Sequence, residues 1–172
     1  MKKKLIWYIF LVGYINGAGP DPMFSENGMV VSTSRQASIA GIEILKKGGN
    51  AVDAACATGF VLAVTSSSNG NVGGGGFMVV HKADSTIFTL DYREIAPAAA
   101  HQDMFLDSNS EVIDNMSLRT RAASGVPGSV DGLLKAWKDH GSGNISRREL
   151  LASAIALAER EFELSHYEAK SV

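Results

Sequence analysis

Apolar residues recur at every third or fourth position in several stretches of the chain, and this spacing predicts helices. The first helix is expected over about 35–47 and the second over about 51–64, where Asn50 is a good N-cap. A third is expected over about 129–140. The run Ser146-Arg-Arg-Glu149 has the form of a capping box and predicts the start of the last helix.

The second of these helices is apolar on all sides, from Ala54 through Phe60 to Ala63. A helix without a polar face is normally enclosed by other elements. The rest of the chain offers few elements for this purpose. We therefore expect this helix to be covered by polypeptide that lies outside the sequence.

Two strands are predicted over Phe77–Lys82 and Thr86–Tyr92, and Ala83-Asp84-Ser85 between them predicts a hairpin turn. The first strand is apolar on both faces, which favours a sheet that is covered on both sides. A further short strand is expected at Met29–Val31, and residues 107–128 are expected to be loop-like.

The N-terminal residues form a separate segment. Lys2–Lys4 precede an apolar run over residues 5–15, and small residues follow. This order is typical of a secretory signal peptide, here residues 1–18, with an uncleaved anchor as the alternative. Residues 19–28 then form a polar leader. An extracytoplasmic location is expected: periplasmic, secreted or membrane-anchored.

Composition and charge narrow the class of protein. The chain has 172 residues, of which 45% are hydrophobic and 20% charged, as is ordinary for a globular protein. Its formal net charge of −2 gives no electrostatic reason to expect a nucleic-acid partner. Cys56 is the single cysteine, so no internal disulfide is expected. Its apolar neighbours favour a buried hydrophobe over a reactive thiol.

Four consecutive glycines, Gly73–Gly76, mark a place where backbone passes through a space that side chains would block. They are not a phosphate-binding loop, because they precede a strand and no Gly-Lys-Ser/Thr follows. The histidines are scattered, without the spacing of metal ligands. No cofactor and no metal site are therefore expected.

Arg93 is the one residue with a specific chemical case. It follows the second strand, and a guanidinium can bind a carboxylate through two parallel hydrogen bonds. At a strand end it could project into a pocket and orient an acidic ligand. The alternative is a structural pair with Glu94 or Asp91.

Several blocks of the sequence resemble the gamma-glutamyltranspeptidase family in content, order and spacing. The likeness extends over about residues 28–165, and its most specific blocks are residues 44–55, 70–78, 90–100 and 124–129. The resemblance implies an α+β fold that is part of the four-layer αββα sandwich of N-terminal-nucleophile hydrolases. Residues 29–172 would then be the N-terminal portion of the large subunit.

The resemblance also implies an activity. Such precursors cleave themselves and expose a threonine at the start of a small subunit. This threonine attacks the gamma-glutamyl amide of glutathione, and an amino acid, a peptide or water resolves the acyl-enzyme. The nucleophile would lie outside this chain, so no catalytic residue is assigned here and the chain alone is expected to be inactive. Its partners would be the remainder of the large subunit and the small catalytic subunit.

The same resemblance assigns Arg93 to the α-carboxylate of the glutamyl group, and the glycine run to a tight passage rather than to an oxyanion hole. Two departures from the family pattern leave other functions open. Thr65–Ser68 stands where many members have an acidic residue and a proline, and Glu161 stands where many have glycine. The alternatives are a non-catalytic or truncated relative that binds without turnover, and a related acylase of glutaryl amides.

Overall fold

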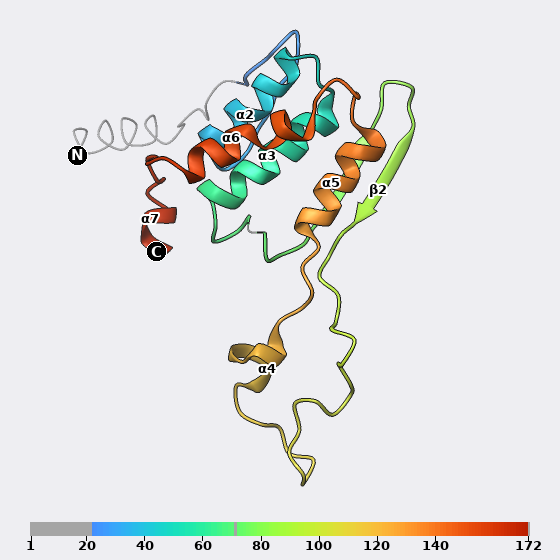
Figure 1. The fold of residues 1–172 in the computed structure, drawn as a ribbon, viewed down its shortest axis with the longest axis vertical. Coiled ribbons are helices and arrows are strands. Elements are labelled where there is room, and N and C mark those ends of the chain that lie inside the picture. The colour runs from blue at the N-terminus through green and yellow to red at the C-terminus, as the bar shows by residue number, and fades with distance from the viewer. Residues whose placement is uncertain (1–21, 71, 172) are drawn as a thin grey trace, which may run out of the picture.

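The computed structural model describes residues 22–70 and 72–171, and Figure 1 shows their arrangement. The elements are α2 (Arg35–Lys46), α3 (Ala51–Thr65), β1 (Phe77–His81), β2 (Ile87–Asp91), α4 (Met116–Arg119), the 3-10 helix η1 (Arg121–Ala123), α5 (Ser129–His140), α6 (Arg147–Ala158) and α7 (Glu168–Ser171). The expected long helices and the hairpin are confirmed, and their observed ends lie close to the predicted ones.

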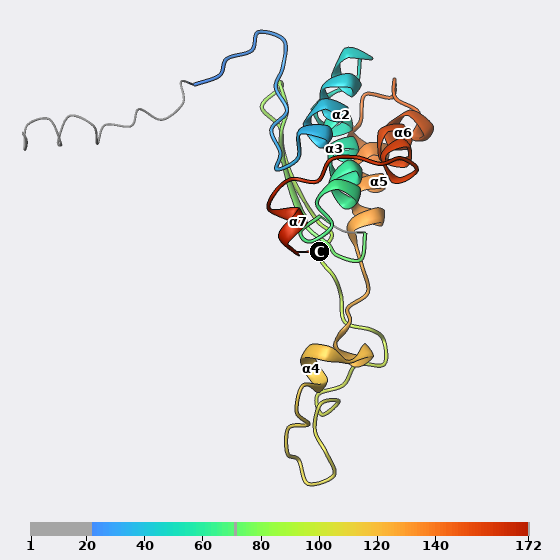
Figure 2. The same ribbon diagram turned by 90° about the vertical axis from the view of Figure 1, so that its left-hand side faces the viewer.

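Helix α3 is the centre of the core. It packs against α2, α5 and α6, as Figures 1 and 2 show. The expectation that α3 needs cover from outside the chain is therefore wrong. Its neighbours supply enough apolar surface, including Ala37 of α2, Leu133 of α5 and Leu150 of α6. The buried apolar residues of α3 are Val52, Ala54, Cys56, Ala57, Phe60 and Val61.

Asp53 joins the start of α3 to the end of α5. Its carboxylate Oδ2 accepts hydrogen bonds from the backbone N–H groups of Asn50, at 2.8 Å, and Ser142, at 2.9 Å. The Asn50 side chain caps the helix in return, so the pair forms a capping box. Because Asp53 is fully buried, these bonds satisfy a carboxylate oxygen that has no access to water.

The hairpin contributes one face to the core and leaves the other open. Strands β1 and β2 pair antiparallel, with Phe77 opposite Asp91. Met78, Val80 and Leu90 pack against the helices. The opposite side, which we call the open face, carries Phe77, Val79 and Ile87, whose exposed fractions are 62%, 73% and 64%. The prediction of a sheet covered on both sides is therefore wrong for the described residues, because the core helices all pack on one side of the hairpin (Figure 2).

Met29–Val31 is not a strand, contrary to the sequence prediction. A strand requires a hydrogen-bonded neighbour, and β1 and β2 pair only with each other among the described residues. The segment is nevertheless partly anchored, because Val30 packs against the helical core.

Residues 95–126, which we call the arm, project away from the helices (Figure 1). Ile95 and Val126 pair at the base of the arm, and Leu106 pairs with Val112 farther out. Not one residue of the arm is buried. The stretch that the sequence predicts to be loop-like contains the short helices α4 and η1. The arm thus has no core of its own.

The predicted signal peptide, residues 1–18, lies outside the described residues, as do the first residues of the predicted leader. Within the part of the chain that the structure describes, every helix is too short or too polar to cross a membrane.

The open face and the arm together predict that residues 29–172 self-associate when they are expressed alone, because apolar side chains such as Val79, Ile87 and Leu118 are exposed. Size-exclusion chromatography with light scattering should show oligomers or aggregates. Lysine at both Val79 and Ile87 should shift the protein toward monomer. Lysine at the polar arm positions Ser108 and Asn109 adds the same charge and is the control. A monodisperse, cooperatively melting monomer of the unsubstituted chain would contradict this prediction.

Candidate functional site

Five glycines pack closely against residues 92–95, where the hairpin leads into the arm, and two of them, Gly75 and Gly128, approach its backbone at residues 92–94. At Gly75 an added Cβ would lie 2.6 Å from the Tyr92 carbonyl oxygen and 2.8 Å from the Arg93 Cα atom. Such distances leave no room for any side chain. We call this group the glycine seat; its members are Gly75, Gly76, Gly125, Gly128 and Gly132.

Backbone hydrogen bonds connect the segments that form the glycine seat. Tyr92 N–H donates to the Gly76 carbonyl at 3.0 Å, and Gly76 N–H donates back to Tyr92 at 3.3 Å. The Gly74 carbonyl accepts from the N–H groups of Gly128, at 2.9 Å, and Ser129, at 3.0 Å. These two donors open helix α5, where N–H groups have no partner within the helix. The glycine run is thus a tight passage that joins the end of the hairpin to the start of α5.

Arg93 is fixed on this seat by three contacts. Its backbone N–H donates to the Asp91 carboxylate at 3.0 Å, and its side-chain Nε donates to Glu94 Oε2 at 3.0 Å. Its guanidinium carbon lies 5.7 Å from the centroid of the Phe77 ring. The terminal Nη1 and Nη2 groups make no hydrogen bond with the described residues. This edge is the one that can bind a carboxylate through two parallel bonds.

Glu94 is held as a carboxylate. Hydrogen bonds from its own backbone N–H and from the Arg93 side chain lower the pKa of Glu94 below its usual value of 4.5. The pair with Arg93 is solvent-exposed, since 60% of the arginine side chain is accessible. Its own contribution to folding stability is therefore small. Its main effect is to orient the guanidinium.

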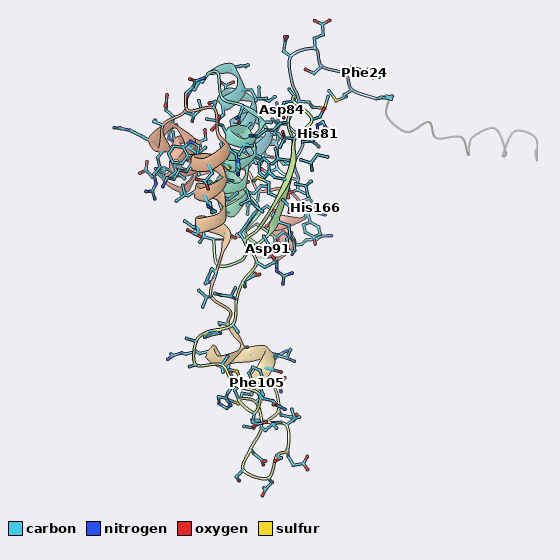
Figure 3. All side chains as sticks on the ribbon, turned by 90° about the vertical axis from the view of Figure 1, so that its right-hand side faces the viewer. Phe24, His81, Asp84, Asp91, Phe105 and His166 are labelled. Atoms are coloured by element: carbon cyan, nitrogen blue, oxygen red, sulfur yellow. The ribbon has the colours of Figure 1, made fainter. Side chains whose placement is uncertain are left out.

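Glu94 and Asp91, the two acids that the sequence analysis names as structural partners of Arg93, both accept a hydrogen bond from it. The terminal nitrogens of the arginine nevertheless make no hydrogen bond with the described residues. A cavity of about 230 Å³ is lined by Tyr92, Glu94 and Gly75 but not by Arg93. Arg93 instead lies with Phe77 on the open face. Figure 3 shows Asp91 at this end of the hairpin, with His81 and Asp84 at the other end.

Phe77 is the residue of this site that sequence reasoning missed. The signal was present in the expected hairpin, because antiparallel pairing places Phe77 opposite Asp91, two residues before Arg93. The spacing alone did not show that the arginine folds back over the aromatic ring.

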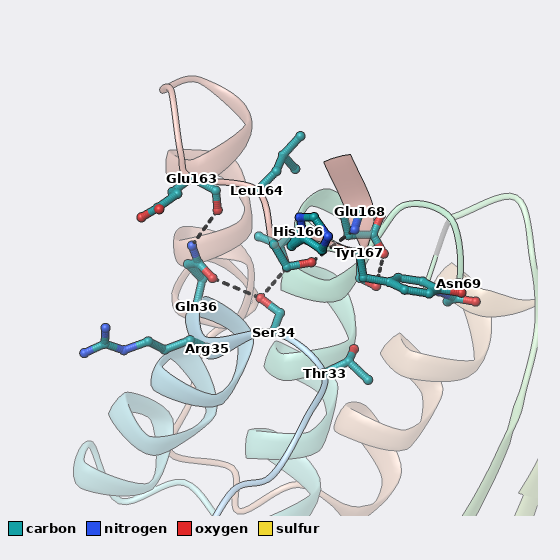
Figure 4. A pocket seen from close by; sticks show the side chains of 13 residues that line it. Thr33, Ser34, Arg35, Gln36, Asn69, Glu163, Leu164, His166, Tyr167 and Glu168 are labelled. Carbon is teal, nitrogen blue, oxygen red and sulfur yellow. Dashed lines mark hydrogen bonds between the residues drawn. The ribbon is translucent and has the colours of Figure 1, made fainter. Parts of the chain in front are cut away.

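A larger cleft, of about 920 Å³, lies between the start of α2, the end of α3 and α7 (Figure 4). Its polar groups bond to each other: Thr65 Oγ1 donates to Ser34 Oγ at 2.8 Å, and Ser34 Oγ donates to Gln36 Oε1 at 3.2 Å. The described residues contain no group of three or more His, Cys, Asp or Glu that could hold a metal ion. We assign no chemistry to this cleft.

Cys56 is buried in α3, and its thiol donates to the Leu133 carbonyl at 3.2 Å. Burial, reinforced by the negative charge of Asp53, raises the pKa of Cys56 to about 12. The thiolate is the reactive form. We therefore expect iodoacetamide to label this thiol only after denaturation, with mass spectrometry as the measurement. Rapid labelling of the folded protein near neutral pH would contradict the assignment.

The same pKa shift has a defined effect on stability. The neutral thiol is favoured in the folded state, so its contribution is fully present below pH 9.0, the ordinary pKa of the thiol. It is lost as the pH rises from 9.0 toward about 12. Denaturant melts on either side of pH 9.0 should therefore show a smaller alkaline loss of stability in Cys56→Ala than in the parent protein. Equal losses in both would exclude this linkage.

The fold is α+β, with helices packed on one face of a hairpin that ends in an exposed arginine. The family model for gamma-glutamyltranspeptidase matches residues 37–172. The chain therefore belongs to the gamma-glutamyltranspeptidase family.

Individual relatives agree with this membership. The chain is 45% identical over 150 residues to a glutathione hydrolase proenzyme of Pseudomonas sp. (strain A14). Among solved structures, it superimposes on the gamma-glutamyltranspeptidase of Helicobacter pylori with a TM-score of 0.82 and 39% identity, over 88% of this chain and 43% of that one. The enzyme from Pseudomonas nitroreducens, solved in complex with L-DON, gives a TM-score of 0.79 and 44% identity, over 86% of this chain and 43% of that one.

The chain covers only part of these relatives. The match to the Pseudomonas sp. proenzyme takes in 87% of this chain but 26% of the proenzyme. The chain thus spans about a quarter of the length of that relative.

Proposed function

We propose that residues 29–172 are the N-terminal portion of the large subunit of an enzyme that transfers or hydrolyses the gamma-glutamyl group of glutathione and related amides. In this proposal Arg93 binds the α-carboxylate of the glutamyl donor. The nucleophile is a threonine in the remaining polypeptide, exposed when the precursor cleaves itself. An amino acid, a peptide or water then resolves the acyl-enzyme.

One observation carries the assignment of Arg93. The guanidinium is held at Nε and against Phe77, while its two terminal nitrogens are free of the described residues. A carboxylate that approaches these nitrogens meets paired donors in a fixed plane. Glu94 bonds only to Nε and Asp91 only to the backbone N–H, so the donors of the Nη1 and Nη2 edge are left for a further carboxylate.

The proposed partners are the remainder of the large subunit and the small catalytic subunit. The open face and the arm support this, because the described residues leave Phe77, Val79 and Ile87 exposed and bury no part of residues 95–126. A second sheet against the open face would complete the four-layer αββα sandwich. Such a layer would also remove water from the surroundings of Arg93 and strengthen its interaction with an anion.

An extracytoplasmic location is part of the proposal and rests on the sequence of residues 1–18 alone. Expression of the full-length gene followed by N-terminal sequencing of the extracytoplasmic protein would test it. A mature N-terminus shortly after residue 18 supports a cleaved signal peptide, and an intact N-terminus in the membrane fraction supports the anchor.

The proposed function is tested with the full-length precursor. The purified protein should separate into two subunits, and it should release the anilide from a gamma-glutamyl anilide faster than it cleaves a matched glutaryl amide. Preference for the glutaryl amide would indicate the acylase alternative. Binding of gamma-glutamyl compounds without subunit separation or turnover would indicate the non-catalytic alternative.

A further inference from the structure

Phe77 has an unusual position for an aromatic residue. It opens strand β1 and is 62% exposed, although burial of a phenylalanine ring is strongly favourable. Its neighbours on the open face, Val79 and Ile87, are aliphatic and have no π face. Phe77 is aromatic, and the Arg93 guanidinium carbon lies 5.7 Å from its ring centroid.

The hairpin sets the backbone position of Phe77. Phe77 pairs with Asp91 across the two strands. The Asp91 carboxylate in turn holds the backbone N–H of Arg93 at 3.0 Å. The ring and the arginine are therefore placed by the same strand pairing. Their contact follows from the register and from the glycine seat, which brings Gly75 against the Arg93 backbone.

Phe77 and Glu94 constrain different parts of the arginine. Glu94 accepts from Nε at 3.0 Å and so fixes one edge of the guanidinium. A single hydrogen bond at Nε still permits the plane to tilt about that bond. The Phe77 ring, within the range of a cation–π contact, limits this motion. The edge formed by Nη1 and Nη2 is then the part of the guanidinium that is left to bind a ligand.

We infer that Phe77 is a positioning residue for substrate binding: its ring holds the Arg93 guanidinium so that the Nη1 and Nη2 edge faces an incoming carboxylate. This inference rests on the proposed function of Arg93. A long side chain that is already ordered loses less conformational freedom when it binds a ligand. Phe77 therefore acts through Arg93 and does not itself touch the substrate carboxylate.

The test uses the full-length protein and the Michaelis constant for a gamma-glutamyl anilide. Phe77→Leu keeps an apolar side chain but removes the π face, and it should raise this constant by roughly 3- to 10-fold, as expected for loss of a partly exposed cation–π contact. The rate constant kcat should change much less. Phe77→Tyr keeps the π face and should restore the parent value. Val79→Leu, on the same strand and face, is the matched control.

A double substitution separates positioning from general packing. In an Arg93→Ala background, Phe77→Leu should cause no further loss of kcat/KM, because the group that the ring orients is gone. A purely structural role would lower kcat/KM by the same factor in both backgrounds. If Phe77→Leu fails to mature into subunits, Phe77→Met repeats the comparison with an unbranched apolar chain.

The possible failures are distinguishable. If Arg93→Ala leaves the Michaelis constant for the donor unchanged, the proposed function of Arg93 is wrong, and the inference falls with it. If Arg93→Ala raises this constant but Phe77→Leu and Phe77→Met leave it unchanged, only the positioning role of Phe77 is wrong. Additive losses in the double variant also overturn the positioning role.

Discussion

Replacing Arg93 with alanine in the full-length protein should lower kcat/KM for a gamma-glutamyl donor by about 2–5 kcal/mol. This corresponds to roughly 30- to 5000-fold. The reason is that, in the proposed function, the variant leaves a substrate carboxylate without its paired donors in a site that further polypeptide would shield from water. Steady-state assays over a range of donor concentrations measure the effect, which should fall mainly on the Michaelis constant.

The matched control is Arg119→Ala, which removes an equally charged and exposed side chain from helix α4 on the arm. Arg93→Lys should retain the charge but lose the planar fork, so its activity should lie between those of the parent and Arg93→Ala. A parent-like kcat/KM for Arg93→Ala would refute the assignment of the arginine to substrate binding.

Replacing Gly75 with alanine should destabilise the protein by about 1–3 kcal/mol or more, because overpacking against immobile atoms forces the backbone to shift. The added Cβ would lie 2.6 Å from the Tyr92 carbonyl oxygen, 2.7 Å from the Glu94 nitrogen and 2.8 Å from the Arg93 Cα atom. All three are backbone atoms, so no side-chain rotation relieves the contact. Thermal melting of the full-length protein should show a transition several degrees lower.

Gly125→Ala is the control for this prediction. It belongs to the same seat, but its added Cβ would meet the Glu94 side chain at 3.0 Å and the Ile95 carbonyl oxygen at 3.4 Å. The nearest of these atoms is the Glu94 Cβ, which no side-chain rotation moves, but a shift of a few tenths of an ångström relieves a contact of this length. Gly125→Ala should therefore lower the melting temperature less than Gly75→Ala does. Equal destabilisation by the two substitutions would show that close backbone approach at Gly75 is not what determines stability here.

Local signals in the sequence were sufficient for the helices and the hairpin. Asn50 and Ser146 cap α3 and α6, and both helices begin where these side chains predict. The turn around Asp84 joins the two strands as expected, and the strands pair antiparallel from Phe77–Asp91 to His81–Ile87. These features depend on residues that are near each other in the chain.

Features that depend on distant partners were not predictable in the same way. Met29–Val31 has the composition of a strand, but a strand also needs a neighbour, and composition carries no information about that neighbour. For a related reason, the sequence analysis underestimated how much of α3 is covered by the other helices of the chain. The apolar stripes of α2, α5 and α6 were each recognised, but their convergence on one helix follows from packing and not from periodicity.

The candidate site was predictable in part. Sequence reasoning selected Arg93 and named Glu94 and Asp91 as its possible partners, and both acids bond to it, one at Nε and the other at the backbone N–H. The placement of Arg93 over Phe77, outside the cavity that Tyr92 and Glu94 line, depends on how the side chain folds back and has no signal in the local sequence. Its role in binding substrate stays a prediction.

The glycine seat has a consequence for the order in which the protein acquires its shape on the ribosome. Gly75 and Gly76 are synthesised before Arg93, whereas Gly128 and Gly132 follow only after the whole arm. In a nascent chain that ends within the arm, the hairpin carries Arg93, but Gly128 and Gly132 are not yet present to pack against residues 92–93. The backbone of Tyr92 and Arg93 is enclosed on its second side only when the start of α5 leaves the exit tunnel, because Gly128 packs against it and the N–H groups of Gly128 and Ser129 then bind the Gly74 carbonyl.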